Sequence, residues 1–155
     1  MHRDEYRRLV TLCLLAIVSG MAFFTGCSNE PPRLLIKNAR VEFSEAMRDE
    51  ASVFLTIQND GGKDTLIGAR TSIPGALADI HEMRGSVMVL SKALPVPAKG
   101  NLDLASGSSH VMLEGIPADV NLGYHFTLTL VFKKSGEIQV PLVITKPRAL
   151  PQRRS

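Results

Sequence analysis

The feature that most constrains this chain is an alternation of apolar and polar residues with a period of two. Residues 51–58 and residues 124–133 show it most clearly, and glycine or proline interrupts it about every ten residues. Successive side chains of a β-strand point to opposite faces of a sheet, so the alternation predicts half-buried strands. No segment after residue 33 has the periodicity of an amphipathic helix. The chain is therefore predicted to be all-β, an antiparallel sandwich with Greek-key connections.

Eight or nine short strands are expected. The candidates are residues 34–43, 51–58, 65–71, 78–83, 87–92, 101–105, 109–113, 124–133 and 137–145. Residues 94–100, which contain two prolines and a glycine, are expected to form a loop. The aromatic and leucine side chains of residues 124–133 fall on one face of their strand, which predicts that this face lies in the core.

The N-terminus resembles a bacterial lipoprotein signal peptide. Residues 1–26 combine a short stretch with three arginines, an apolar run over 9–24 and a Gly26-Cys27 ending. In this interpretation Cys27 is lipidated, residues 27–33 tether the membrane to the domain, 34–146 form the domain and 147–155 a flexible basic tail. The alternative is an uncleaved membrane anchor, since the apolar run falls just short of the ~20 residues of a spanning helix. Both readings place the domain outside the cytoplasmic membrane.

The composition excludes several functions. The net charge is only +3, and no basic stripe with interleaved aromatic residues supports nucleic-acid binding. No nucleophile–base pair or carboxylate dyad has a spacing that supports catalysis. The two cysteines are Cys13, in the apolar run, and Cys27. The mature domain thus has no thiol for a disulfide, and a soft-metal site in it must use methionine and histidine.

Two His-x-Met units and one further methionine form the strongest chemical motif of the chain. They contribute His81, Met83, Met88, His110 and Met112. Imidazole nitrogen and thioether sulfur are neutral, soft donors that suit copper, above all Cu(I). Side chains two residues apart on a strand share a face, so each unit presents both of its donors on one side. The pattern predicts a single site with two imidazoles and two or three thioethers, Met83 being the optional third.

A hairpin is expected to complete the first half of this site. If Arg84 and Gly85 are its two central residues, with glycine supplying the positive φ that such turns need, His81 pairs with Met88. Directly opposed residues have Cβ atoms only ~4.5–5.5 Å apart, close enough to share an ion. Met47, in a polar loop, and His125, with no methionine on its strand, are interpreted as lying outside the site.

Neutral ligands also indicate what such a site does. They leave the charge of the ion uncompensated, which favours Cu(I) over Cu(II) and a partly exposed position over a buried one. Thioethers do not titrate, and imidazole needs no deprotonation above its unperturbed pKa of ~6.5. An exposed site permits ligand exchange with a partner, which is the property of a carrier.

The mature region resembles the bacterial periplasmic copper chaperone family PCu(A)C over Ala39 to Val143. The residues that carry the resemblance are His81-Glu82 ahead of Val87-Met88, the Leu94–Gly100 segment, His110-Val111-Met112-Leu113, Leu128-Thr129-Leu130 and Gly136-Glu137-Ile138. The resemblance implies a cupredoxin-like sandwich that binds Cu(I) at an exposed site. It also implies delivery to the CuA centre of cytochrome c oxidase, with subunit II or another chaperone as the receiving protein.

By position, the resemblance makes His81, His110 and Met112 copper ligands. The family's remaining ligand methionine falls on Leu90, which cannot bind a metal, so Met88 or Met83 must substitute or the site has three ligands. The alternative function is a lipoprotein interaction module whose metal site has decayed. The oligomeric state is left open.

Overall fold

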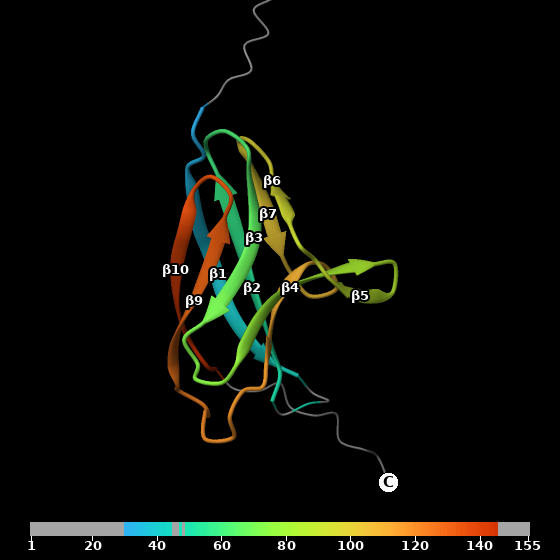
Figure 1. The fold of residues 1–155 in the computed structure, drawn as a ribbon, viewed down its shortest axis with the longest axis vertical. Helices are drawn as coiled ribbons and strands as arrows, with labels where there is room; N and C mark the ends of the chain where they lie inside the picture. Colours follow the sequence, from blue (N-terminus) through green and yellow to red (C-terminus); the bar gives the residue numbers. More distant parts are fainter. Residues whose placement is uncertain (1–29, 45–46, 48, 146–155) are drawn as a thin grey trace, which may run out of the picture.

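The computed structural model describes residues 30–44, 47 and 49–145. Cys27, the predicted signal peptide and the predicted tail 147–155 lie outside these residues. Within them, no helix is long and apolar enough to cross a bilayer. The described chain instead forms two antiparallel sheets around one hydrophobic core (Figure 1), which confirms the all-β prediction.

The first sheet has the strand order β1-β2-β8-β4-β5, and β7 also pairs with β2. Its strands are β1 (Leu34–Phe43), β2 (Ala51–Asn59), β4 (Leu77–Arg84), β5 (Val87–Leu90), β7 (Gly100–Leu104) and β8 (His110–Glu114). The second sheet has the order β10-β9-β3-β6. Its strands are β3 (Asp64–Thr71), β6 (Leu94–Val96), β9 (His125–Phe132) and β10 (Gly136–Val143).

The core between the sheets is built from the predicted alternating faces. The alternating apolar residues of β9 and β2 face this core, each at most 5% exposed: Phe126, Leu128, Leu130, Phe132, Ala51, Val53, Leu55 and Ile57. Their polar neighbours on β9 and most of those on β2 are partly or fully exposed. The period-two pattern therefore predicted the core faces of both strands correctly.

The segment Leu94–Val96 was wrongly predicted to belong to a loop. It forms β6, an edge strand that pairs with Asp64–Leu66 of β3. Leu94 and Val96 are buried while Pro95 is exposed. Proline cannot donate a hydrogen bond to a neighbouring strand, but an edge strand has an unpaired side that tolerates it. Proline was read as a loop signal because the sequence does not reveal which strands lie at an edge.

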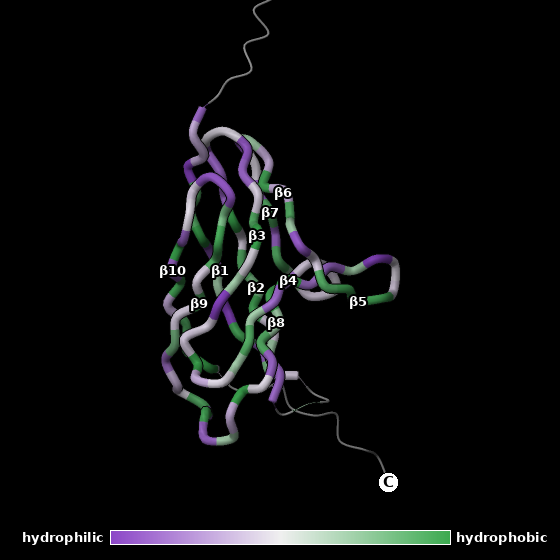
Figure 2. The backbone as a smooth tube through the Cα atoms, in the orientation of Figure 1, coloured by the Kyte–Doolittle hydropathy of each residue, from purple (hydrophilic) through white to green (hydrophobic). Residues whose placement is uncertain are grey.

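The β4–β5 hairpin projects sideways from the sandwich, with β5 at the edge of the first sheet (Figure 1). Its outer strand is apolar despite this position (Figure 2). Val87 and Leu90 are each 60% exposed and Met88 is 45% exposed. The hairpin therefore presents apolar side chains and one thioether to the surroundings.

Asp64 joins the start of β3 to the turn between β9 and β10. The residue is only 4% exposed. Its carboxylate accepts hydrogen bonds from the backbone N–H groups of Thr65 (2.7 Å), Lys134 (2.9 Å) and Ser135 (2.9 Å). It also accepts one from the Ser135 hydroxyl, at 2.6 Å. Burial alone would raise the pKa of this carboxyl, but the donated hydrogen bonds outweigh it and hold the pKa below its ordinary value of 3.8.

We expect Asp64→Asn to lower the free energy of unfolding at neutral pH by about 2 kcal/mol, because amide oxygen and NH2 replace a charged acceptor facing several donors. A pKa lowered on folding contributes stability above the ordinary pKa and loses it as pH falls through the folded value. Urea unfolding at neutral and acidic pH should therefore show the variant converging with the parent in acid. The exposed Asp119→Asn is the control, and a deficit that is unchanged in acid would contradict the role of the charge.

Candidate metal centre

The two predicted histidines face each other across neighbouring strands. β4 pairs with β8 so that His81 lies directly opposite His110. The ring centroids are 6.0 Å apart and the ring planes meet at 88°. The fold thus joins two histidines that lie far apart in sequence, as a shared site requires.

His110 is held with one nitrogen free. The residue is 7% exposed, and its Nδ1 lies 3.0 Å from the Ser108 carbonyl oxygen. A carbonyl can only accept a hydrogen bond, so Nδ1 carries the proton and donates it. The lone pair of the ring is then on Nε2, which is the tautomer that a metal-binding imidazole with an outer hydrogen-bond partner adopts.

His81 contains the unexplained polar atom of this region. Its Nδ1 is buried and has no hydrogen-bond partner among the described residues. A buried polar atom without a partner costs free energy, so native structures seldom leave one unless another function uses it. Because this nitrogen belongs to the ring that faces His110, a metal ion shared by the two rings would account for it.

Met112 adds sulfur to the same face of the sheet. It lies two residues after His110 on β8 and opposite Ser52 of β2, whose hydroxyl is 4.0 Å from the Met112 sulfur. The residue is 8% exposed. His110 and Met112 thus form the buried part of the donor set.

The predicted hairpin register was wrong by one residue in the turn. The turn residues are Gly85 and Ser86, and Gly85 has a φ of 65°. Met83 therefore pairs with Met88, and His81 pairs with Leu90 instead of Met88. Glycine at the first central position is typical of a type II′ turn. The prediction had wrongly placed Gly85 at the second central position.

This error does not change which side chains share a face of the hairpin. Moving the centre of a two-residue turn by one position changes each cross-strand partner by two residues, and residues two apart share a face. His81, Met83 and Met88 consequently remain on one side of the hairpin, now with Leu90 beside His81. Glu82 lies on the opposite face, where it forms an ion pair of 2.7 Å with Arg84.

An open groove of about 490 Å³ connects the donors to solvent. Four of the five predicted ligands line it, namely Met83, Met88, His110 and Met112. His81 is not among the lining residues. Met47 and Phe54 also line the groove, although neither was predicted to belong to the site, and so do the acidic residues Glu42 and Glu50.

Met47 and Phe54 were missed for different reasons. Met47 is 53% exposed and comes from the loop between β1 and β2, so only the chain reversal brings its thioether to the groove. Phe54 alternates with the core-facing residues of β2, yet it is only 5% exposed because its ring lies between Arg40 and His110. The Arg40 Cζ atom is 4.8 Å from the Phe54 ring centroid, and the Phe54 and His110 ring centroids are 5.9 Å apart. No local pattern in the sequence signals either contact.

The donor set has the chemistry of a soft-metal site. Within the described ranges, no group of three or more His, Cys, Asp and Glu side chains could hold a metal ion. The two imidazoles and the neighbouring thioethers are the combination of donors that suits Cu(I).

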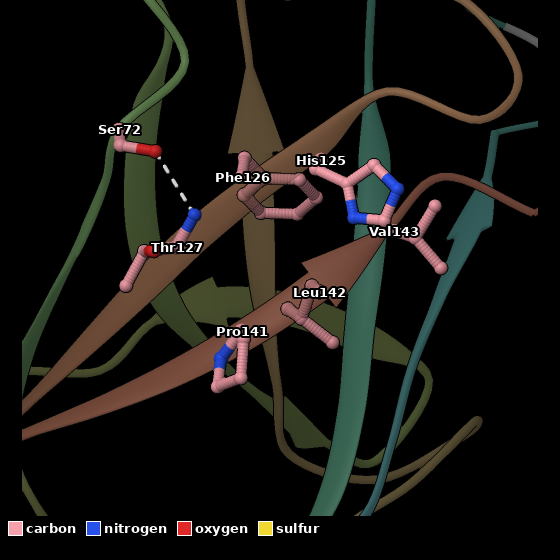
Figure 3. Close-up of a pocket in the computed structure, with 7 residues that line it drawn as sticks. All are labelled: Ser72, His125, Phe126, Thr127, Pro141, Leu142 and Val143. Carbon is pink, nitrogen blue, oxygen red and sulfur yellow. Dashed lines mark hydrogen bonds between the residues drawn. The ribbon is translucent and has the colours of Figure 1, made fainter.

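A second hollow involves the remaining histidine of the described chain. The residues that line it are His125, Phe126, Thr127, Pro141, Leu142, Val143 and Ser72 (Figure 3). The Ser72 hydroxyl accepts a hydrogen bond of 2.9 Å from the Thr127 N–H. None of the described residues that line this hollow is a methionine. His125 is exposed, in agreement with its interpretation as a surface residue.

Comparison with known proteins places these features in a family context. A family model described as "Putative lipoprotein LpqE-like" matches residues 34–144. A search of curated proteins finds no match. Among solved structures, the apo PCuAC domain from PmoF1 is 25% identical, with 74% of this chain and 94% of that chain covered and a TM-score of 0.63.

Two further matches have bound copper. The copper-bound PCuAC domain from PmoF2 is 23% identical, with 74% of this chain and 93% of that chain covered and a TM-score of 0.59. The Cu(I) form of DR1885 from Deinococcus radiodurans is 21% identical, with coverage of 80% and 85% and a TM-score of 0.60. At these identities the likeness to the two copper-bound proteins establishes the shared fold.

Proposed function

Because the chain belongs to the LpqE-like family, we propose that it is an extracytoplasmic copper carrier that binds Cu(I) and passes it to a client protein. His81, His110 and Met112 hold the ion, and Met88 or Met83 supplies a further sulfur. Two of the structures with this fold contain copper, one of them as Cu(I), which supports copper as the cargo. The role is binding and transfer, not catalysis.

The main support for this proposal is the pair of imidazole nitrogens on His81 and His110. The unpartnered Nδ1 of His81 belongs to a ring that meets His110, whose Nε2 is left free by the Ser108 hydrogen bond. A ligand that accepts electron pairs from both rings would use both nitrogens. The thioethers of the adjoining groove are neutral donors, so the bound ion keeps its charge and favours a partly solvated position.

The groove also suits release of the ion. Met112 is buried at its inner end, whereas Met88 is 45% exposed at the hairpin. A partner's ligands can therefore replace the exposed thioether before the buried donors, which is the order that ligand exchange requires. We propose that the client that receives the copper is the CuA site of cytochrome c oxidase subunit II or another chaperone.

The cellular setting belongs to the same proposal. A lipidated Cys27, after removal of residues 1–26, would anchor the domain to a bacterial membrane facing the periplasm; the lipoprotein description of the family supports this. We likewise propose a cupredoxin-like, Greek-key description of the sandwich.

A second function is favoured by one specific residue. Leu90 occupies the position opposite His81 and is 60% exposed in an apolar hairpin. Loss of the metal site with retention of the hairpin would leave a protein-interaction module.

A Cu(I) competition titration against a chromogenic chelator separates the two functions. We expect the parent protein to withdraw close to one Cu(I) per chain from the chelator, because one set of donors surrounds the paired histidines. The titration should be done anaerobically with reductant, and the eluted complex should keep its copper through gel filtration. A chain that withdraws no copper at any chelator ratio would be an interaction module.

A further inference from the structure

The first described residues, Glu30–Arg33, are fixed to the turn between β2 and β3. The Gly62 N–H donates to the Pro31 carbonyl at 3.1 Å, and the Asp60 N–H donates to the Arg33 carbonyl at 3.0 Å. The Arg33 N–H donates to the Asn59 side-chain oxygen at 3.1 Å. The Arg33 guanidinium also donates to the Asp60 carbonyl at 2.6 Å. A free linker would make none of these bonds.

The turn that receives this segment is itself held in place. Asn59 is fully buried, and its side-chain nitrogen donates to the carbonyls of Gly62 and Pro97 at 2.7 and 2.8 Å. Glu30 pairs with Arg33 at 2.7 Å and with Lys99 at 3.7 Å. The Arg33 hydrogen bond is the main reason that the pKa of Glu30 is lowered. Because exposed ion pairs stabilise little, the backbone bonds are the main fixation.

Two glycines make room for the segment. A Cβ atom at Gly61 would collide with the Pro31 carbonyl, and one at Gly62 would collide with the Glu30 carbonyl. Neither glycine has a positive φ. Their lack of a side chain therefore serves the close approach of the segment, not the conformation of the turn.

The groove lies on the side of the sandwich, displaced from the end that holds residues 30–33. β1 begins at Leu34, paired with Asn59, and ends at Phe43, paired with Ala51. Phe43 and its neighbours in the β1–β2 connection line the groove. Phe54, which also lines the groove, pairs with Arg40, six residues along β1 from Leu34. The groove therefore begins about 20 Å from the fixed segment and extends to the hairpin that projects sideways (Figure 1).

The end that carries the fixed segment is rich in exposed lysines. Lys63, Lys99, Lys133 and Lys134 are exposed and belong to three turns, and Glu30 partly compensates the charge of Lys99. These turns are joined, since the Lys99 N–H donates to the Gly61 carbonyl and the Lys134 N–H donates to Asp64. Anionic lipid headgroups attract lysines near a membrane surface by about 1 kcal/mol each.

We propose that residues 30–33 lock this lysine-bearing end of the sandwich against an anionic lipid surface, so that the metal groove is held at a distance from the membrane. The inference rests on the proposed lipid anchor at Cys27. Only Ser28 and Asn29 lie between Cys27 and Glu30, which limits the distance between these two Cα atoms to about 10 Å. The protein that receives the metal is then a soluble protein, or a domain that stands well above the membrane.

The full lipidated chain in phosphatidylglycerol-containing vesicles tests this orientation. Lipidation occupies the Cys27 thiol, so Ala98→Cys or Leu122→Cys introduces a unique site for a fluorophore. Ala98 lies at the lysine-bearing end, and Leu122, 51% exposed, lies in the connection that precedes β9, at the opposite end of that strand from the Lys133 turn. Nitroxide-headgroup lipids quench only fluorophores near the surface, and we expect several-fold stronger quenching at position 98.

Gly62→Ala provides the decisive variant. Its new methyl group displaces Glu30, so the difference in quenching between positions 98 and 122 should largely disappear while Cu(I) affinity is unchanged. Gly68→Ala is the matched control, because its Cβ would meet only Val131 at 3.9 Å and should leave the difference intact. Equal quenching at both positions in the parent would overturn the orientation without affecting the copper titration. A parent that does not associate with vesicles would overturn the orientation together with the anchor.

Discussion

Replacement of both His110 and Met112 by alanine is expected to weaken Cu(I) binding by at least about 100-fold, because the variant loses the two buried donors of the site. Even the loss of an outer hydrogen-bond partner of a metal ligand typically lowers metal affinity by about 10–100-fold. Both residues are less than 10% exposed on β8. The measurement is the same chelator competition, with fold retention checked by circular dichroism.

Packing must be separated from coordination in this experiment. Alanine leaves a cavity where Met112 stood, whereas His110→Gln with Met112→Leu nearly conserves volume and removes the same nitrogen and sulfur donors. The conservative pair should lose copper as fully as the alanine pair. His125→Ala, an exposed histidine in a different hollow, should bind copper like the parent. Parent-like affinity in both double variants would eliminate the proposed centre.

Leu90→Met is expected to act in the opposite direction and strengthen Cu(I) binding by about tenfold or more, the scale on which single groups around a metal site act. Leu90 lies opposite His81 on the face that also carries Met83 and Met88. A thioether at this position would stand beside the ring that has the unpartnered nitrogen. Leucine and methionine are similar in volume and the position is 60% exposed, so stability should not change.

Val87→Met is the matched control for this gain. It adds a methionine to the same strand at the same exposed fraction of 60%, but on the opposite face of the hairpin. Competition titrations of the two variants should therefore differ, with only Leu90→Met exceeding the parent. No gain at position 90 would mean that Met88 or Met83 already fills the place of the family's methionine.

The family resemblance drawn from the motifs is confirmed by the matching PCuAC structures and the LpqE-like model. Its weakest point was the hairpin. The sequence contains one glycine between the two strands, and either neighbour of Gly85 can share the turn with it. The structure takes the register in which Gly85 and Ser86 form the turn and Arg84 pairs with Val87.

The sequence determined every strand except β6, together with the faces of the strands, because both follow from the local, two-residue repeat of extended backbone. It therefore located β1 and the core side of β9, and it placed the donors of each His-x-Met unit on one side. A turn misplaced by one residue could not disturb those faces, since partners shift in steps of two.

Tertiary structure alone decided which strands became neighbours. The opposition of His81 and His110, the arrival of Met47 in the groove and the fixation of residues 30–33 on the β2–β3 turn all join segments distant in sequence. Such contacts form where burial of the whole core compensates the entropy of closing long loops. That balance depends on every strand at once, so no local pattern of residues encodes it.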